Sequence, residues 1–411
     1  MFIVAQENGR PIVELQHLNS IRGGLAIKNL HHVKDPNEAT QANLRAKTRL
    51  NCLMLEWNEG VDEEQEPSST VVEVAADVLE KLQPRRNLRE LDIRYYIGTR
   101  LPNWMSSSFP NLVQLTMWDL NRCEHLPLGQ RLSLKHLDLR KMHAMRRIGE
   151  EFYGDGGDIT FPSLEKLTLL DMPNLEKWHT EPMMAGRKMA SFPCLTNLLI
   201  QSCPKLEVQP YIPCSVGTLK MISCNQMLLS AGSLAGLSKL RYLYIHRCGA
   251  SSSSSRWWDG LQYLTALEYI GISQCDELTC LPEGIICLPL LETLDLKRNK
   301  NLSLDREGRK QQQPTPFTAL RYLKMEEADM LTALPGWVGG LTSLQNLQIV
   351  DCPNLAMLPD SLQHLTALQE LHISNLPKLA MLPDSLQRLT ALQKLKMSNL
   401  HQLEMLPDSL Q

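Results

Sequence analysis

The feature that most constrains this chain is a repeat of fixed length near its C-terminal end. The block Leu-x-x-Leu-x-(Leu/Ile/Met) begins at Leu344, Leu368 and Leu392, at intervals of 24 residues. Each of these blocks is followed by Leu-Pro-Asp-Ser-Leu-Gln. Self-similarity at a fixed period of this length is the sequence signature of a repeat architecture. Earlier copies of the block begin at Leu50, Leu88, Leu112, Leu134, Leu164, Leu195, Val216, Leu240, Leu267, Leu291 and Leu320.

Two degenerate copies, around Leu25–Ile27 and Phe2–Val4, bring the total to about sixteen units. The amino-acid composition agrees with a repeated unit that uses leucine as its standard core residue. Leucine accounts for 74 of the 411 residues, whereas Phe, Trp and Tyr together make up only 5%.

The block itself predicts the local structure. Alternation of Leu-x-Leu places the leucines on one face of a short strand and the x residues on the other. One such strand cannot bury its leucines alone, but stacked units share a continuous core. The sequence therefore predicts an α/β fold, a leucine-rich-repeat solenoid shaped as a horseshoe or superhelix. Its parallel β-sheet would be concave, with about sixteen repeats and return turns often set by Leu-Pro.

We expect one leucine-rich-repeat domain over residues 1–411. Residues 1–84 hold degenerate repeats with an acidic insertion, 85–319 hold irregular repeats, and 320–411 hold regular 24-residue repeats. Longer spacings mark excursions from the repeat, which are either binding or regulatory loops or merely solvated length that a solenoid tolerates. These excursions are acidic Asp62–Glu66 with a helix predicted over Val71–Leu82, Gly149–Thr160, Trp178–Ser191, Ser251–Ser255 and Arg306–Pro316.

Several cysteines recur at one place in the repeat, three residues after the last apolar residue of the strand block. Asn299 holds the same place in its own unit. At this position the side chain is expected to turn inward and to satisfy backbone groups where the chain leaves the strand. The cysteines at this place are Cys203, Cys224, Cys248, Cys275 and Cys352.

The odd total of eleven cysteines, without close Cys-x-x-Cys pairs, disfavours a disulfide framework and favours a reducing compartment. We therefore expect a cytoplasmic location, with the nucleus as an alternative. A once-per-repeat spacing does not suit a metal site, which needs paired ligands at short spacing.

Other function classes find no support in the sequence. The near-neutral net charge of −3 argues against a nucleic-acid partner, and no apolar run is long enough for a membrane span. No P-loop, nucleophile elbow or His-Glu-x-x-His motif occurs. We expect no enzyme, no catalytic residue, no cofactor and no metal, and a protein as the partner.

Seven stretches are more specific than the leucine pattern that all the repeats share. These are Leu18–Leu30, Ala42–Leu44, Leu53–Trp57, Tyr96–Trp104, Ile148–Gly154, Phe161–Glu165 and Met172–Trp178. In them the chain resembles the leucine-rich-repeat region of plant disease-resistance receptors of the coiled-coil nucleotide-binding type, especially those of cereals. The resemblance implies a role in innate immunity, with a pathogen effector or a guarded host protein as partner. It also implies control of the nucleotide-binding module of a full receptor.

That module and its P-loop are absent from this sequence. The sequence begins inside an early repeat and stops about four residues before its last repeat would be complete, so we expect a truncated product, a fragment or a partial gene model. One alternative is a free-standing adaptor such as a ubiquitin-ligase substrate-recognition subunit, although 1–24 lacks a convincing adaptor-binding segment. An extracellular receptor domain is disfavoured by the missing signal peptide.

Candidate binding residues occupy the x positions of the strand blocks, which face outward. Exposed tyrosine and arginine dominate binding hot spots, so a cluster of them in an aromatic-poor chain predicts a protein-binding surface. The alternative is a ladder of stacked side chains that only stabilises the sheet. Trp57 and Trp118, just after strand blocks, are weaker candidates. The chosen residues form three expected rows, namely Tyr242, Tyr269 and Tyr322; Tyr244, Asp295 and Lys324; and Arg241, Glu268 and Arg321 with Glu292.

Overall fold

The structure is a computed structural model of the whole chain. It describes all residues except 5–9, 59–66, 107–108, 130–131, 155–158, 182, 185–186, 189, 226–227, 229, 235, 250–256, 305–316 and 404–411. The packing of Cα atoms divides the chain into two compact units, Met1–Val216 and Gly217–Gln411. Each unit is described separately below.

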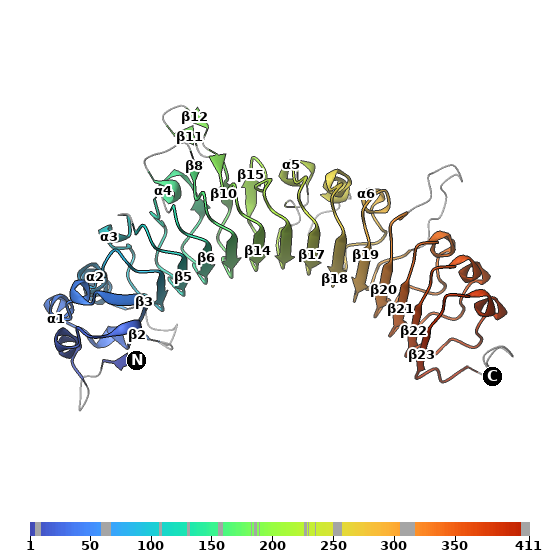
Figure 1. Cartoon of the computed structure of the whole chain (residues 1–411), viewed down its shortest axis with the longest axis horizontal. Helices are drawn as coiled ribbons and strands as arrows, with labels where there is room; N and C mark the ends of the chain where they lie inside the picture. The colour runs from blue at the N-terminus through green and yellow to red at the C-terminus, as the bar shows by residue number, and fades with distance from the viewer. Residues whose placement is uncertain are drawn as a thin grey trace. The chain divides into compact units, whose positions relative to one another are not determined.

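The first unit contains eight parallel strands that follow one another in chain order (Figure 1). They are β1 (Phe2–Ile3), β2 (Arg22–Lys28), β3 (Arg49–Glu56), β4 (Glu90–Arg94), β5 (Gln114–Trp118), β6 (His136–Arg140), β9 (Lys166–Leu170) and β14 (Asn197–Gln201). Both degenerate N-terminal units therefore form strands, as the sequence predicts.

Between these strands the first unit carries helices and short outer strands. The helices are α1 (Pro36–Gln41), α2 (Ser69–Lys81), α3 (Asn103–Ser106) and α4 (Glu150–Tyr153), with the 3-10 helices η1 (Ile12–His17), η2 (Leu30–His32) and η3 (Leu44–Ala46). The outer strands are β7 (Arg147–Ile148), β8 (Ile159–Thr160), β10 (Lys177–His179), β11 (Met183–Met184), β12 (Arg187–Lys188), β13 (Ala190–Ser191) and β15 (Glu207–Gln209). Helix α2 confirms the helix predicted over 71–82, although it begins two residues earlier and ends one residue earlier.

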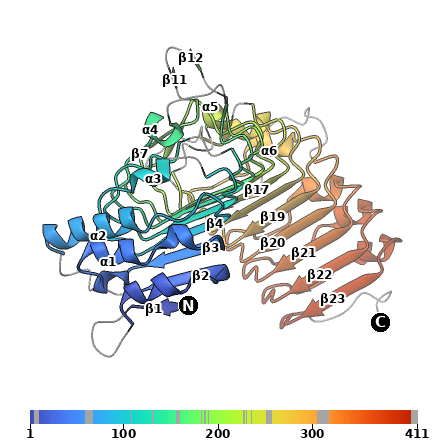
Figure 2. The same cartoon turned by 60° about the vertical axis from the view of Figure 1, so that its left-hand side comes forward.

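The second unit also contains eight parallel strands in chain order. They are β16 (Thr218–Ile222), β17 (Tyr242–His246), β18 (Tyr269–Ser273), β19 (Thr293–Lys297), β20 (Tyr322–Glu326), β21 (Asn346–Val350), β22 (Glu370–Ser374) and β23 (Lys394–Ser398). The return segments hold α5 (Ala231–Leu234), α6 (Glu283–Ile286), η5 (Trp257–Tyr263), η6 (Gly336–Gly340), η7 (Asp360–His364) and η8 (Asp384–Arg388). Figure 2 shows β19 to β23 as a stack of parallel arrows with their return turns on one side.

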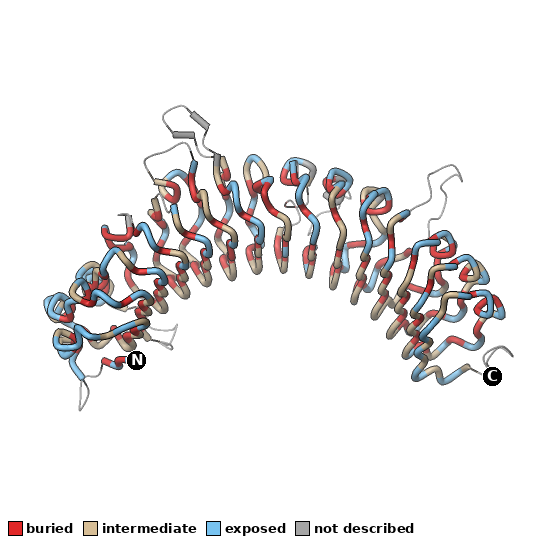
Figure 3. Tube along the Cα trace, viewed as in Figure 1, coloured by how far each residue is buried: buried red, intermediate tan, exposed pale blue. Residues whose placement is uncertain are grey.

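The leucine block explains the strands. From β4 onward, each strand of the two eight-strand series begins two residues after the first apolar residue of its block. The second and fourth residues of each such strand point inward. The inner rows pair leucine with leucine across neighbouring strands, as Leu91 with Leu115 and Leu323 with Leu347. These side chains are at most 2% exposed, and Figure 3 shows the resulting alternation of buried and half-buried residues along the strands. The predicted leucine-rich-repeat fold is confirmed.

The chain turns sharply at the same place in each repeat, directly after the strand. From β4 onward, the residue directly after each strand of the two eight-strand series has a left-handed backbone with φ between 51° and 64°. The very next residue then points inward, which brings the Cys/Asn position under the sheet. The thiol of Cys248 donates to the carbonyl of Met221 in the neighbouring repeat, at 3.6 Å. Asn299 makes two hydrogen bonds to the neighbouring repeat: its Nδ2 donates to Ile272 O at 2.9 Å, and its Oδ1 accepts from the amide of Cys275 at 3.0 Å. The predicted inward role of this position is confirmed.

Two excursions of the first unit build an aromatic core instead of a solvated loop or a binding loop. Phe152 and Tyr153 from the first excursion, and Trp178 from the second, are at most 1% exposed. The indole of Trp178 donates to Tyr153 Oη at 3.1 Å, and the rings of Phe161 and Phe192 stack at 5.5 Å. These buried parts thus serve packing. The predicted acidic insertion Asp62–Glu66, the serine run Ser251–Ser255 and the excursion Arg306–Pro316 lie outside the described residues.

Within the described part of the chain, no helix combines the length and the apolar character that a membrane crossing requires.

The replacement Asn299→Ala tests the Cys/Asn position. It leaves a buried carbonyl and a buried amide of the neighbouring repeat without partners, so we expect a loss of about 2 kcal/mol of stability. Amide exchange at Cys275 should accelerate at the same time. Asn301→Ala is the matched control, because the exposed Asn301 side chain makes one bond, to Asp276 O. Equal losses of stability in both variants would contradict the role assigned to Asn299.

Thiol reactivity tests the inward placement of the cysteines. Burial raises the pKa of the Cys123, Cys203 and Cys275 thiols to about 12 and that of Cys352 to about 11. The thiolate is the reactive form, so these groups should resist a disulfide reagent such as DTNB at pH 8. We expect rapid labelling of the four exposed cysteines, and labelling of all eleven only after unfolding. Rapid labelling of Cys275 in the folded protein would show that its thiol is exposed to solvent, which would contradict the inward placement. The exposed cysteines are Cys194, Cys214, Cys280 and Cys287.

Candidate functional site

The candidate binding residues lie on the outward face of the second unit's sheet, on strands β17 to β20 and directly before them. The strand register places Tyr242, Tyr269, Thr293 and Tyr322 in one row across these strands. It places Tyr244, Asp295 and Lys324 in the next row. The structure thus brings together the rows expected from the sequence. We call the nine chosen residues the tyrosine surface, namely Arg241, Tyr242, Tyr244, Glu268, Tyr269, Asp295, Arg321, Tyr322 and Lys324.

The tyrosines contact one another through their rings. Tyr244 and Tyr269 approach most closely, with ring centroids 4.7 Å apart, and Tyr242 follows at 6.4 Å from Tyr269. Tyr242 is 42% exposed, while Tyr244, Tyr269 and Tyr322 are half-buried. The ammonium of Lys220 lies 4.9 Å from the centroid of the Tyr244 ring, within the range of a cation–π contact. The rings are therefore held in place before any partner arrives.

A glycine that sequence reasoning passed over makes room for this arrangement. Gly271 lies in the row between Tyr244 and Asp295 and carries no side chain. A Cβ atom at Gly271 would stand 3.0 Å from Tyr269 Oη and 3.1 Å from Tyr269 Cε1. The Tyr269 ring therefore leans over Gly271 toward the neighbouring strands. A glycine inside a strand, two residues after a tyrosine, was the available signal, since such a glycine often marks a close approach.

Asp295 is the acceptor at the centre of the surface. Its Oδ2 accepts from Tyr269 Oη at 3.3 Å and lies 3.1 Å from Lys297 Nζ. Its Oδ1 is buried and has no hydrogen-bond partner among the described residues. A partner with an N–H or O–H group could supply the missing donor. Lys324 pairs with Glu326 at 2.5 Å and so leaves this oxygen open.

The predicted arginine–glutamate row also forms. Arg241 and Glu268 lie 3.4 Å apart, and Arg321 and Glu292 lie 3.8 Å apart. Both pairs are exposed or half-exposed, so each contributes at most about 1 kcal/mol to stability. These pairs border the tyrosines with exposed charges and add little to the stability of the fold.

Burial, together with the negative charge of Asp295, raises the pKa of the Tyr269 hydroxyl. Burial likewise raises the pKa of Tyr322. Both hydroxyls are therefore neutral donors and acceptors over the whole physiological pH range.

The two tryptophans behave differently from each other. Trp57 is only 1% exposed and packs edge-on against Tyr96 at 4.9 Å, so the suggestion that it contacts a partner is wrong. Trp118, at the end of β5, is half-buried on the outward face of the first unit's sheet. The guanidinium carbons of Arg94 and Arg140 lie 5.3 and 5.8 Å from its ring centroid.

Each of these arginines is fixed by an aspartate two residues earlier in the chain. Arg94 pairs with Asp92 at 2.7 Å and Arg140 pairs with Asp138 at 2.6 Å. These hydrogen bonds raise the pKa of both guanidinium groups. The signal in the sequence was the motif Asp-x-Arg, which occurs on the strands either side of Trp118. The outward face of the first unit thus carries a rigid cluster of Trp118, Arg94 and Arg140, which the sequence analysis did not predict.

Among the described residues, no group of three or more His, Cys, Asp or Glu side chains is arranged to hold a metal ion. What the two outward faces offer is rings, guanidinium groups and carboxylates at fixed spacing. This chemistry suits recognition of another protein.

Comparison with known proteins agrees with this view of the fold. Residues 12–142 match the family model described as R13L1/DRL21 leucine-rich repeats. An RPP13-like disease resistance protein of Arabidopsis thaliana is 30% identical over 318 residues, which are 69% of this chain and 30% of that protein. The disease resistance protein RGA1 of Solanum bulbocastanum is 33% identical over 286 residues, which are 69% of this chain and 27% of that protein. The chain thus spans about a third or less of the length of these relatives.

Among solved structures, the Drosophila Toll–Spatzle complex contains a chain that is 17% identical, with a TM-score of 0.46. The match covers 98% of this chain and 43% of that one. Likeness at this level carries no argument about function. The sequence relatives match at higher identity, 30 and 33%, over 69% of this chain. The chain is a leucine-rich-repeat relative of the plant disease resistance proteins, with repeats of the R13L1/DRL21 type over residues 12–142.

Proposed function

We propose that this chain is a recognition region of a plant defence protein and binds a protein partner through the tyrosine surface. The observation that carries the proposal is the gathering of three tyrosines in one strand row, around an aspartate with an open acceptor. Tyrosine and arginine are the residue types that most often dominate binding energy at interfaces. Rigid rings also lose little conformational entropy when a partner binds.

The alternative, in which the ladder only stabilises the sheet, explains less. A stabilising ladder needs contacts between neighbouring side chains, and Tyr244 with Tyr269 provides one. It does not need Tyr242 to remain 42% exposed at the end of the row or Asp295 Oδ1 to remain unpaired. Both features suit a surface that is completed by a second protein.

The partner class follows from the relatives. Because the named relatives are disease resistance proteins, we propose a pathogen effector or a guarded host protein as the partner. Most of the length of those relatives lies outside the region matched by this chain. In a full receptor, we propose that residues 1–411 act as one leucine-rich-repeat domain and restrain a nucleotide-binding module until the partner binds. We place this activity in the cytoplasm or nucleus and expect no enzymatic step.

The combined replacement of Tyr242, Tyr269 and Tyr322 by alanine tests the surface. In a full-length receptor that carries these repeats, we expect the defence response to the recognised pathogen to be lost. Loss of central hot-spot residues costs about 2 kcal/mol or more each, which corresponds to roughly thirtyfold in affinity. Receptor abundance must be measured alongside, since half-buried tyrosines also support stability.

The matched control lies on the same row. Asn346, Glu370 and Lys394 continue the row of Tyr322 across β21 to β23, and their combined replacement by alanine should leave the response intact. An unchanged response in the tyrosine variant at normal abundance would refute the proposal. Loss of response in both variants would show that any truncation on the face is harmful.

Gly271→Ala is a finer test, because it alters the position of a ring without removing one. The new Cβ would meet Tyr269 Oη at 3.0 Å and should push the ring away from Tyr244. We expect weaker defence signalling while the melting temperature changes little, since strands favour alanine slightly over glycine. Gly232→Ala is the control for the substitution itself, because a Cβ there meets nothing within 4 Å. Full signalling by Gly271→Ala would mean that the ring position does not matter.

A further inference from the structure

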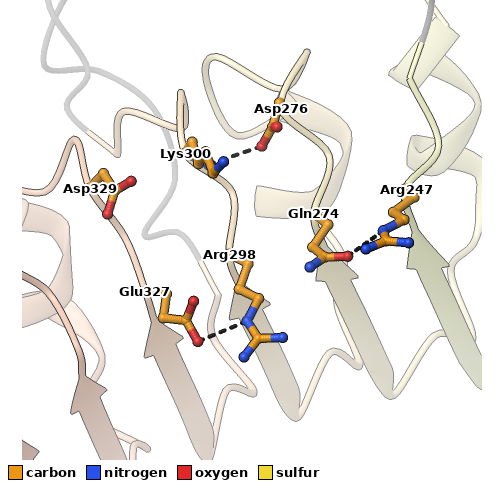
Figure 4. A pocket seen from close by; sticks show the side chains of 7 residues that line it. All are labelled: Arg247, Gln274, Asp276, Arg298, Lys300, Glu327 and Asp329. Carbon is orange, nitrogen blue, oxygen red and sulfur yellow. Dashed lines mark hydrogen bonds and ion pairs between the residues drawn. The ribbon is translucent and has the colours of Figure 1, made fainter.

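A hollow of about 440 Å³ lies at the edge of the second unit's sheet, beyond the ends of β17 to β20 (Figure 4). Its walls are polar and charged, and it shares no residue with the tyrosine surface. Three of its side chains follow directly after strands, at the left-handed position: Arg247 after β17, Gln274 after β18 and Arg298 after β19. Glu327 after β20 completes this row.

The choice of residues at these left-handed positions is costly for the fold. Asn and Asp adopt positive φ with little strain, whereas long side chains rarely do. The regular repeats nearby follow this preference, with Asp351, Asn375 and Asn399 at the same place. Tyr95 and Lys141 break it on single strands of the first unit, whereas Arg247, Gln274, Arg298 and Glu327 break it on four consecutive strands of the second. Runs of such outliers are characteristic of functional sites, where local strain is maintained for another purpose.

The hydrogen bonds in the hollow leave several donors of neighbouring side chains open. Arg247 Nε donates to Gln274 Oε1, and Arg298 Nε donates to Glu327 Oε1 at 2.8 Å. Each guanidinium is thus anchored through Nε, and its terminal nitrogens have no partner among the described residues. Since Gln274 Oε1 is occupied, the amide nitrogen of Gln274 faces the Arg298 side (Figure 4). The amide nitrogen of Gln274 and the terminal nitrogens of Arg247 and Arg298 are therefore open hydrogen-bond donors that follow three neighbouring strands.

The lining holds three cations and three carboxylates, so its positive charge is local to the two guanidinium groups. Burial lowers the pKa of the neighbouring His246, and the positive charges of Arg247 and Arg298 lower it further. Two carboxylates in the lining stand apart from the guanidinium groups. Asp276 accepts from the Lys300 amide at 3.4 Å, and Asp329 lies at the far wall.

We propose that this hollow is a second docking surface, where Arg247, Gln274 and Arg298 hold acidic side chains of a protein partner. Arginine groups that are oriented in advance bind carboxylates through strong, charge-assisted hydrogen bonds. Strands β17 to β19 span about 10 Å, which two neighbouring acidic side chains of one segment can cover. A protein is favoured over a small anion because the site is open and wide. Gln274 also orients Arg247 through its carbonyl oxygen, and Glu327 is a positioning residue for Arg298.

The probe is a fluorescent hexaglutamate peptide, mixed with chain 1–411 at low ionic strength. We expect a rise in anisotropy that weakens as salt is added, and no rise with hexaglutamine. Replacing Arg247 and Arg298 together by asparagine should weaken binding by about tenfold or more. The melting temperature of this variant should be equal or higher, since asparagine suits the left-handed backbone. Lost binding therefore cannot be attributed to unfolding.

The control variant replaces Arg388 and Lys378 by asparagine, which changes the net charge by the same amount in the same unit. Both side chains donate to neutral amide oxygens, as Arg247 does. Unchanged binding in this control supports the proposal, and equal weakening in both variants refutes it as general charge attraction. Equally tight binding of inorganic phosphate, or of an oligodeoxythymidine, would refute the assignment to an acidic protein segment. The triple tyrosine variant should still bind hexaglutamate, so failure of one proposal leaves the other standing.

Discussion

Every other feature of this structure depends on leucine side chains stacking from strand to strand. A single five-residue strand offers two inward side chains, which cannot form a core alone. Pairing them with the same positions in the next repeat, as Leu323 pairs with Leu347, extends the core by one layer at each strand. The register runs without a shift from β4 to β14 in the first unit and from β16 to β23 in the second. Since the register is fixed by the buried leucines, the outward side chains also fall into straight rows.

Packing and recognition use different parts of the sequence. The stretches that most specifically resemble the resistance proteins include Phe152, Tyr153 and Trp178, and all three are buried in the aromatic core of the first unit. The outward positions of the strands face solvent and are held by the backbone pairing. A substitution there changes the surface with little effect on the core, so recognition can vary while the fold is retained.

The sequence predicted the strands, the inner rows, the three outward rows and the Cys/Asn ladder, because all of these follow from one repeated spacing. It predicted less well wherever a residue interacts outside that spacing. Trp57 is buried by Tyr96 from the next repeat, which no periodicity within one block reveals. The role of Gly271 depends on the direction in which the Tyr269 ring leans. The cluster of Arg94, Arg140 and Trp118 forms only because the sheet places two Asp-x-Arg motifs from separate strands on either side of Trp118.

The straight rows have a geometric consequence for any partner. Neighbouring side chains in a row are separated by the distance between strands, about 4.8 Å, whereas same-face side chains of an extended segment are about 6.7 Å apart. An extended segment laid across the strands therefore loses alignment within two or three of them. An α-helix, with a pitch of 5.4 Å, stays aligned for longer. If a protein binds the row of Tyr242, Tyr269 and Tyr322, the strand spacing therefore favours a helical surface of that partner over an extended one.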